Sequence, residues 1–441
     1  MRQGPSAAAL MDTNAEFRAL RRKPATTASW RDLATTGPLV AVLCTRLVCA
    51  AVAMLTTYAF VVTQPLWLRD PLHAEALRGL AKRLFEPWAH WDGVWFVRIA
   101  SGGYRAHPAG AAFFPLYPLL VRGLMPLAFH NYVVAGVCVS LSCYAAAMLV
   151  LDRLVEQEAG SQIARGTVLL ISVFPMAFFF QAVYSESLFL LLSLLSFWAG
   201  RRGRWGLAGA FGLLAALTRN SGLLLVAPLL VMWWEQRRAK ALRLPGGPLA
   251  TTPRARPPAL RSLALLALVP AGLGLYALYL WRVLGQPFAF TTAQRDWGRS
   301  LSWPSTTLWR AFYYSGEALF GLARHTYGSL DGLSLSLHGV QRLSDLPEFC
   351  ALLFAGWLIW VSWRRLPACY TLYALVACLF PLCFPEKSEP LASYPRLLAV
   401  NFPLFIALAG VLARHQRWRW PIIAVMASLS VIATAIFASF A

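Results

Sequence analysis

The chain has 441 residues, of which 58% are hydrophobic and only 13% are charged, and its mean hydropathy is +0.55. A soluble protein carries roughly 25% charged residues, so this composition excludes an ordinary soluble enzyme and indicates a chain that lies mostly in lipid. The formal net charge of +21 comes from short basic segments between apolar runs, which is typical of cytoplasmic loops rather than of a nucleic-acid-binding protein.

The first 37 residues are polar and basic, and an apolar run follows them. That run is about 25 residues long, which exceeds the hydrophobic core of a signal peptide. We therefore expect residues 1–37 to form a cytoplasmic segment and the run to be kept as the first membrane span.

A helix needs about 20 apolar residues to cross the hydrocarbon core of a bilayer. Apolar runs that approach or meet this length predict spans near 38–63, 131–151, 165–184, 186–200, 261–284, 348–364, 367–385, 395–413 and 420–440. A further run between 204 and 237 is interrupted and has basic clusters on both sides, so two short helices with an outward-facing break would keep both clusters inside. Residues 38–441 therefore predict an all-α polytopic membrane domain with about 11 crossings.

The charge bias places two long, aromatic-rich segments, 64–130 and 285–347, on the side that faces away from the cytoplasm. Within the first of them, the spacing of apolar residues predicts an interfacial helix over 77–85 and a short helix over 92–100. Because Asp92 begins the second helix, one role open to it is that of a helix N-cap.

A catalytic role for Asp92 is the other reading of the tetrad His90-Trp91-Asp92-Gly93. A general base needs a carboxylate within hydrogen-bond reach of the attacking hydroxyl. Rings such as Trp91 and Trp95 shield a carboxylate from water and offer faces on which sugars stack. We therefore take Asp92 as the candidate base, and His90, Trp91 and Trp95 as candidate substrate-binding residues.

Two arginines are candidates for binding a phosphate. Arg219 interrupts an apolar segment, where an arginine is costly and tends to be functional, and a guanidinium matches phosphate oxygens. Its alternative role is to hold the backbone carbonyls of a broken helix. Arg396 begins a later span on the same outer side and either completes a basic clamp or reaches to the interface. Glu186, after a tight outer turn, either orients one of these arginines or stabilises the first turn of its helix.

Further candidates are weaker. Gln294, Arg295 and Trp297 in the second outer segment offer polar and aromatic groups to a sugar or a lipid headgroup, or form a solvated interfacial loop. Arg46, in the first span, is expected to extend its side chain towards the cytoplasmic surface.

Several motifs are missing from the chain. It contains no P-loop, no dinucleotide-binding glycine pattern and no acidic pair suited to a divalent metal. Its eight cysteines show no metal-ligand spacing. We therefore expect no metal and no cofactor, and this pattern favours a lipid-phosphate donor over a nucleotide sugar.

The chain resembles the PIG-V family of mannosyltransferases, within the GT-C superfamily. The most diagnostic motifs are the Trp-Asp tetrad at 90–93 and Phe-Phe-Pro-Leu-Tyr-Pro at 113–118. The stretches that carry the resemblance follow in order along the chain, at 90–96, 99–104, 113–120, 184–189, 217–222, 294–299 and 394–397.

The resemblance implies a GT-C fold with its site at the outer face of the membrane. It implies a polyprenyl- or dolichyl-phosphate sugar as donor, usually mannose, a glycan or glycolipid as acceptor, and Asp92 as the base. The short Arg-rich N-terminus is similar to that of bacterial members, so we expect an inner-membrane protein with an extracytoplasmic site, contacts with membrane lipids and no nucleic-acid partner.

The hypothesis from the sequence is an inverting mannosyltransferase in which Arg219 and Arg396 hold the phosphate. The alternative from another class is a transporter or flippase of a lipid-linked sugar, which the break at 218–222 supports because transporters carry broken helices. A third possibility is a non-catalytic partner subunit.

Overall fold

The computed structural model describes residues 37–59, 77, 79–241, 260–323 and 337–439. Within these ranges the chain is helical, and its β-structure is a single bridge between Arg299 and Glu386. The predicted all-α class is therefore confirmed for this part of the chain. The predicted cytoplasmic segment 1–37 lies, apart from Gly37, outside the described residues.

The helices vary widely in length. In chain order they are α3 (Pro38–Ala59), α5 (Gly79–Phe85), η1 (Glu86–Ala89), α6 (Asp92–Ala106), η2 (Pro108–Ala112), α7 (Leu116–Leu124), η3 (Met125–Leu127), α8 (Tyr132–Ala159), α9 (Ser161–Ser172), η4 (Ala177–Phe180), α10 (Glu186–Arg201), α11 (Trp205–Thr218), η5 (Asn220–Leu225), α12 (Val226–Ala241), α13 (Arg261–Leu266), α14 (Leu268–Leu284), α15 (Ala289–Asp296), α16 (Pro304–Ala323), α17 (Leu337–Arg365), α18 (Ala368–Leu382), α19 (Tyr394–Ala399), α20 (Phe402–Arg414) and α21 (Gln416–Ser439).

The long apolar helices make the protein an integral membrane protein. Among the described residues, five stretches are long and apolar enough to span a bilayer, namely Pro38–Ala59, Tyr132–Ala159, Arg261–Leu284, Ser344–Arg365 and Gln416–Ser439. Other predicted spans are shorter: α10 has 16 residues, α11 has 14 and α20 has 13. The helix α10 is largely buried, so such short helices pack among the long ones.

The interrupted run between 204 and 237 forms the predicted pair of short helices, α11 and α12. Gln236 Nε2, near the end of α12, donates to the carbonyl of Gly200 at 2.8 Å, so the basic ends of α10 and α12 lie side by side. The reversal at η5 needs a glycine, because a Cβ on Gly222 would come within 2.4 Å of the α11 backbone at Ala215 and Ala216.

Two predicted spans are not single helices: 395–413 is divided at Val400 and Asn401 into α19 and α20, and 165–184 ends early. The run 165–184 was expected to be one helix, but α9 ends at Ser172 and turns and η4 follow. The reason lies in the sequence, since the residue before a proline, here Phe174 before Pro175, is disfavoured in helical conformation.

The broken backbone after α9 explains Arg46, which was expected to extend towards the surface and does not. Arg46 is only 5% exposed, and its guanidinium donates to the carbonyl oxygens of Ser172, at 3.0 Å, and Ala177. It also lies 5.3 Å from the ring centroid of Tyr144. A helix end buried in a membrane needs donors for its carbonyls, and Arg46 supplies them.

The described parts of both predicted outer segments contain helices. In the first, α5 and α6 confirm the two predicted helices, although α6 continues to Ala106. In the second, the 20-residue α16 packs against α17, with Ser315 Oγ donating to the carbonyl of Asp345 at 3.3 Å. No helix was predicted within 285–347, whereas its described residues form α15, α16 and the start of α17.

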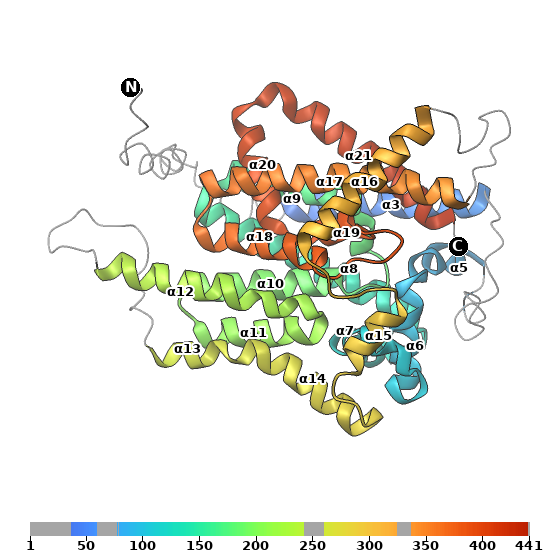
Figure 1. Cartoon of the computed structure of the whole chain (residues 1–441), viewed down its shortest axis with the longest axis horizontal. Helices are drawn as coiled ribbons and strands as arrows, with labels where there is room; N and C mark the ends of the chain where they lie inside the picture. The colour runs from blue at the N-terminus through green and yellow to red at the C-terminus, as the bar shows by residue number, and fades with distance from the viewer. Residues whose placement is uncertain (1–36, 60–76, 78, 242–259, 324–336, 440–441) are drawn as a thin grey trace.

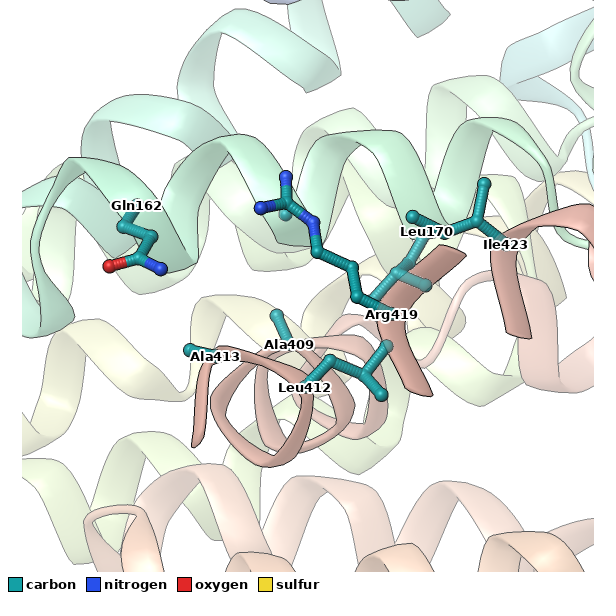
Figure 2. A pocket seen from close by; sticks show the side chains of 8 residues that line it. Gln162, Leu170, Ala409, Leu412, Ala413, Arg419 and Ile423 are labelled. Carbon is teal, nitrogen blue, oxygen red and sulfur yellow. The ribbon is translucent and has the colours of Figure 1, made fainter. Parts of the chain in front are cut away.

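The two ends of the helical bundle differ. Figure 1 shows α6, α7 and α15 gathered on the right, whereas the basic end of α12 and the start of α13 lie on the left. A crevice between α9, α20 and α21 is lined by Gln162, Leu170, Leu412 and Arg419 among others, and Figure 2 shows Arg419 reaching across it.

Candidate active site

Four charged side chains from four distant parts of the chain form one network. Arg396 Nη1 lies 2.6 Å from Asp92 Oδ2, and Arg396 Nε lies 2.5 Å from Glu186 Oε1. Arg219 Nη1 lies 2.7 Å from the same Glu186 oxygen. We call these four residues the charged network; it joins the starts of α6 and α10 to the break after α11 and to α19.

Glu186 is the centre of the charged network. Its side chain is 1% exposed, against 12% for Arg396 and 18% for Arg219. Ser185 Oγ accepts a further, longer hydrogen bond from Arg219 Nη1 at 3.3 Å. The structure thus brings Glu186 into contact with both arginines, which is the first of the two roles considered for it from the sequence.

Asp92 is not the helix cap that its position had suggested as an alternative. Trp91 occupies the N-cap position, with φ 56°, and Asp92 is the first helical residue. Its carboxylate accepts from Arg396, and 28% of its side chain is exposed. The carboxylate is therefore held by a guanidinium but remains reachable from outside the protein.

The tetrad is fixed to the turn that precedes α10. Tyr184 Oη donates to the carbonyl of His90 at 2.9 Å, and the amide of Val183 donates to the carbonyl of Trp88 at 2.8 Å. Because Glu186 lies two residues after Tyr184, these bonds set the distance between the carboxylates of Asp92 and Glu186.

The side chain of His90 is turned into the protein. Its residue is 6% exposed, and its ring lies 6.2 Å from that of Phe437 in edge-on contact. Burial lowers the pKa of His90 to about 4, so the imidazole is neutral at neutral pH. A neutral, buried ring is a poor partner for phosphate, so this placement argues against the binding role considered for His90.

Aromatic rings pack against the charged network. The Arg396 guanidinium lies 4.8 Å from the ring centroid of Phe179 and 4.5 Å from that of Tyr184. Phe437, from the last described helix, contacts the rings of both at 5.5 and 6.3 Å. Contacts of this kind stabilise a cation that lies over a ring face, so Phe179 and Tyr184 hold Arg396 in place.

A second aromatic group joins the two outer segments. The ring of Trp95, one turn along α6 from Asp92, lies 5.7 Å from Trp297 and 6.1 Å from Phe113. Among the described residues, the side chains of Gln294 and Arg295 form no hydrogen bond or ion pair with the charged network; their carbonyls instead accept from the turn that follows α15. Trp91 is 46% exposed.

Arg299 is a residue for which no role was predicted. It follows Trp297 and donates from Nη1 and Nη2 to the carbonyls of Phe384 and Ala392, both at 3.4 Å. Burial lowers the pKa of Arg299, and its charge interacts with those of Asp92, Arg396 and Arg219. Its position at the end of the 294–299 stretch was the available signal.

The described residues hold no group of three or more His, Cys, Asp and Glu side chains placed to bind a metal ion. The two acids of the charged network are engaged by arginines instead.

Fold and site together define an integral membrane protein that carries a mixed-charge network between the ends of its helices. Residues 39–233 match the family described as mannosyltransferase (PIG-V). The resemblance stated from the motifs is therefore confirmed for this part of the chain, which contains Asp92, Glu186 and Arg219 but not the stretches at 294–299 and 394–397.

The relatives match only in part. GPI mannosyltransferase 2 of Drosophila pseudoobscura pseudoobscura is 30% identical over 137 residues, which are 29% of this chain and 28% of that protein. A structure of the Archaeoglobus fulgidus oligosaccharyltransferase tethered to an acceptor peptide aligns over 91% of this chain and 55% of its own, with 12% identity and a TM-score of 0.44. The same organism's enzyme with an inhibitory peptide and dolichol-phosphate aligns over 93% and 56%, with 12% identity and a TM-score of 0.43. The chain thus spans under a third of the curated relative and about half of these structures.

Proposed function

We propose that the protein is a membrane glycosyltransferase of the GT-C type that moves mannose, with inversion, from a polyprenyl-phosphate mannose to a glycan or glycolipid. The observation that carries this proposal is the direct contact of Arg396 with both Asp92 and Glu186, beside Arg219. A candidate base and two candidate phosphate ligands meet there. The family match of residues 39–233 supports the same activity.

The reaction follows from the charges. The acceptor hydroxyl gives its proton to Asp92 while its oxygen attacks the anomeric carbon of the donor. The bond from that carbon to the phosphate oxygen breaks, and polyprenyl phosphate leaves with the electron pair. Arg219 and Arg396 stabilise the negative charge that develops on the leaving group.

The contact between Arg396 and Asp92 implies an order of events. Donor phosphate and Asp92 compete for the same guanidinium, whose Nη1 is 2.6 Å from the carboxylate. When phosphate binds Arg396, Asp92 is free to accept a proton. The carboxylate of Asp92 thus stays paired with Arg396 until the phosphate of a donor replaces it.

We place the site on the extracytoplasmic side of a bacterial inner membrane. The basic ends of α10, α12, α17 and α20 carry Arg201, Arg237, Arg364 and Arg414, and basic ends favour the cytoplasm. The lipid part of the donor then lies in the bilayer, with its phosphate at the outer surface.

The test is Asp92→Asn, assayed with a labelled polyprenyl-phosphate mannose in proteoliposomes. Loss of a general base lowers the rate about 10²–10⁴-fold, and we expect a fall of this size with unchanged insertion and folding. Asp296→Asn, at an exposed acid at the end of α15, is the matched control and should transfer normally. Wild-type turnover by Asp92→Asn would remove Asp92 from the mechanism.

One observation favours a second function, a transporter or flippase of a lipid-linked sugar. The helical backbone is interrupted at the extended residue Arg219, between α11 and η5, and broken helices are common in transporters. Movement of the labelled lipid across the same proteoliposomes, without sugar transfer, would support this alternative against the enzyme.

A further inference from the structure

The charged network has no spare positive charge for a donor. Its two carboxylates, Asp92 and Glu186, balance its two guanidinium groups, Arg219 and Arg396. A sugar phosphodiester brings one more negative charge to this partly buried place. Burying an unbalanced charge is costly, so tight donor binding calls for another cation.

Arg299 is a cation that lies close to the charged network. Its Nη2 lies 3.4 Å from the carbonyl of Ala392, four residues before Arg396, and its charge interacts with those of Asp92, Glu386, Arg396 and Arg219. Its two hydrogen bonds, to the carbonyls of Phe384 and Ala392, are both 3.4 Å long, beyond the usual length for N–H···O contacts. An arginine has five N–H donors, so these weak bonds leave it able to grip an anion.

The backbone around Arg299 is fixed from both sides. Arg299 pairs with Glu386 in the single described bridge, and the amide of Ser302 donates to the carbonyl of Cys383 at 2.9 Å. On the other side, Trp297 contacts Trp95 of α6 at 5.7 Å. The segment 297–302 therefore spans from the helix of Asp92 to the chain that leads into Arg396.

We propose that Arg299 is a third phosphate-binding residue, which adds a positive charge beside the charged network and recruits the phosphate of the lipid donor. This inference rests on the proposed function and adds a residue to it. Arg299 binds the donor and not the acceptor, because it contacts the chain that leads into Arg396, a candidate phosphate ligand.

A purely structural role for Arg299 would act through the 383–392 segment. Glu386 is the nearby acid that could serve such a role, but among the described residues it forms no ion pair with Arg299, and its carboxylate accepts from Ser388 Oγ at 3.0 Å. Arg310 also donates to this segment, at the carbonyl of Lys387. These two residues provide matched controls.

The experiment measures donor and acceptor kinetics, together with the affinity for polyprenyl phosphate alone, in nanodiscs. Arg299→Gln should raise the donor KM and weaken polyprenyl phosphate binding about 10–100-fold, the range expected for a lost charged hydrogen bond. The acceptor KM should not change. Arg299→Lys should recover part of the loss, since it keeps the charge but not the planar fork. Glu386→Gln and Arg310→Gln should behave as wild type.

Two results would overturn the inference. One is an Arg299→Gln variant with wild-type affinity for polyprenyl phosphate. The other is an equal donor defect in Glu386→Gln or Arg310→Gln, which would assign Arg299 to holding the segment. The proposed function fails separately, if wild-type protein transfers no sugar. The affinity measurement still tests Arg299 in that case.

Discussion

Glu186 shows how one side chain sets the geometry of a site. It is 1% exposed and accepts from both Arg219 and Arg396 through one oxygen. An unpaired buried charge costs several kcal/mol, so neither arginine can leave Glu186 freely. Arg396 can exchange Asp92 for a phosphate because its contact with Glu186 persists.

His90 gives a pH-dependent prediction at the residue scale. Burial lowers its pKa from 6.5 to about 4, so the folded state favours the neutral ring. The contribution of His90 to the free energy of unfolding is therefore at its maximum above about pH 6.5. It falls as the pH drops towards 4, and the total loss is about 3 kcal/mol. His90→Phe should flatten this part of the curve of unfolding temperature against pH in detergent, between pH 7.5 and 4. Parallel curves for the two proteins would contradict it.

Residues of unusual character were predictable from sequence, and so was a contact of Glu186 with an arginine, but the direct contact of Arg396 with Asp92 was not. Arg219 drew attention as a charge in an apolar segment, and Asp92 as an acid between tryptophans. Their link runs through Arg396 and Glu186, and it depends on how four distant segments pack. Arg299 was missed because an arginine in an interfacial segment looks ordinary until its neighbours are known.

The break between α11 and η5 carries a prediction at the element scale. Gly222→Ala would put a Cβ within 2.4 Å of the α11 backbone, so η5 must move and shift Arg219. Overpacking of this kind costs typically about 1–3 kcal/mol, and we expect lower thermal stability together with weaker transfer. Gly274→Ala, in α14, where nothing lies within 4 Å, is the control and should match wild type. Normal stability and transfer in Gly222→Ala would show that the turn has room to spare.

Elements were predicted best where local signals decide. Apolar length found the long helices, and basic flanks found the α11–α12 pair. The end of α9 was missed although Phe174-Pro175 marks it, because the apolar run continues past it. The helix α16 was missed because its exposed aromatic face, with Trp309 at 66% and Phe320 at 69%, suits an interfacial loop equally well.

The sidedness of the protein is a prediction for the whole molecule. The background for the test is a variant in which the exposed Cys44 and Cys350 are changed to serine. Two single cysteines are then introduced separately: Lys387→Cys near the charged network, and Arg417→Cys at the basic end of the helical bundle. A membrane-impermeant maleimide should label Lys387→Cys in intact cells and Arg417→Cys only after permeabilisation, as the positive-inside bias requires. The reverse pattern would move the site to the cytoplasm.

Phe437 has a consequence for biosynthesis. It belongs to α21, the last helix described, yet its ring contacts Trp88 and His90 beside the tetrad. During translation the tetrad is synthesised long before Phe437. Until Phe437 is added, the charged network therefore lacks one of the rings that pack beside it. The site can therefore form fully only after α21 is inserted, and chains whose synthesis stops before α21 should be inactive and sensitive to protease.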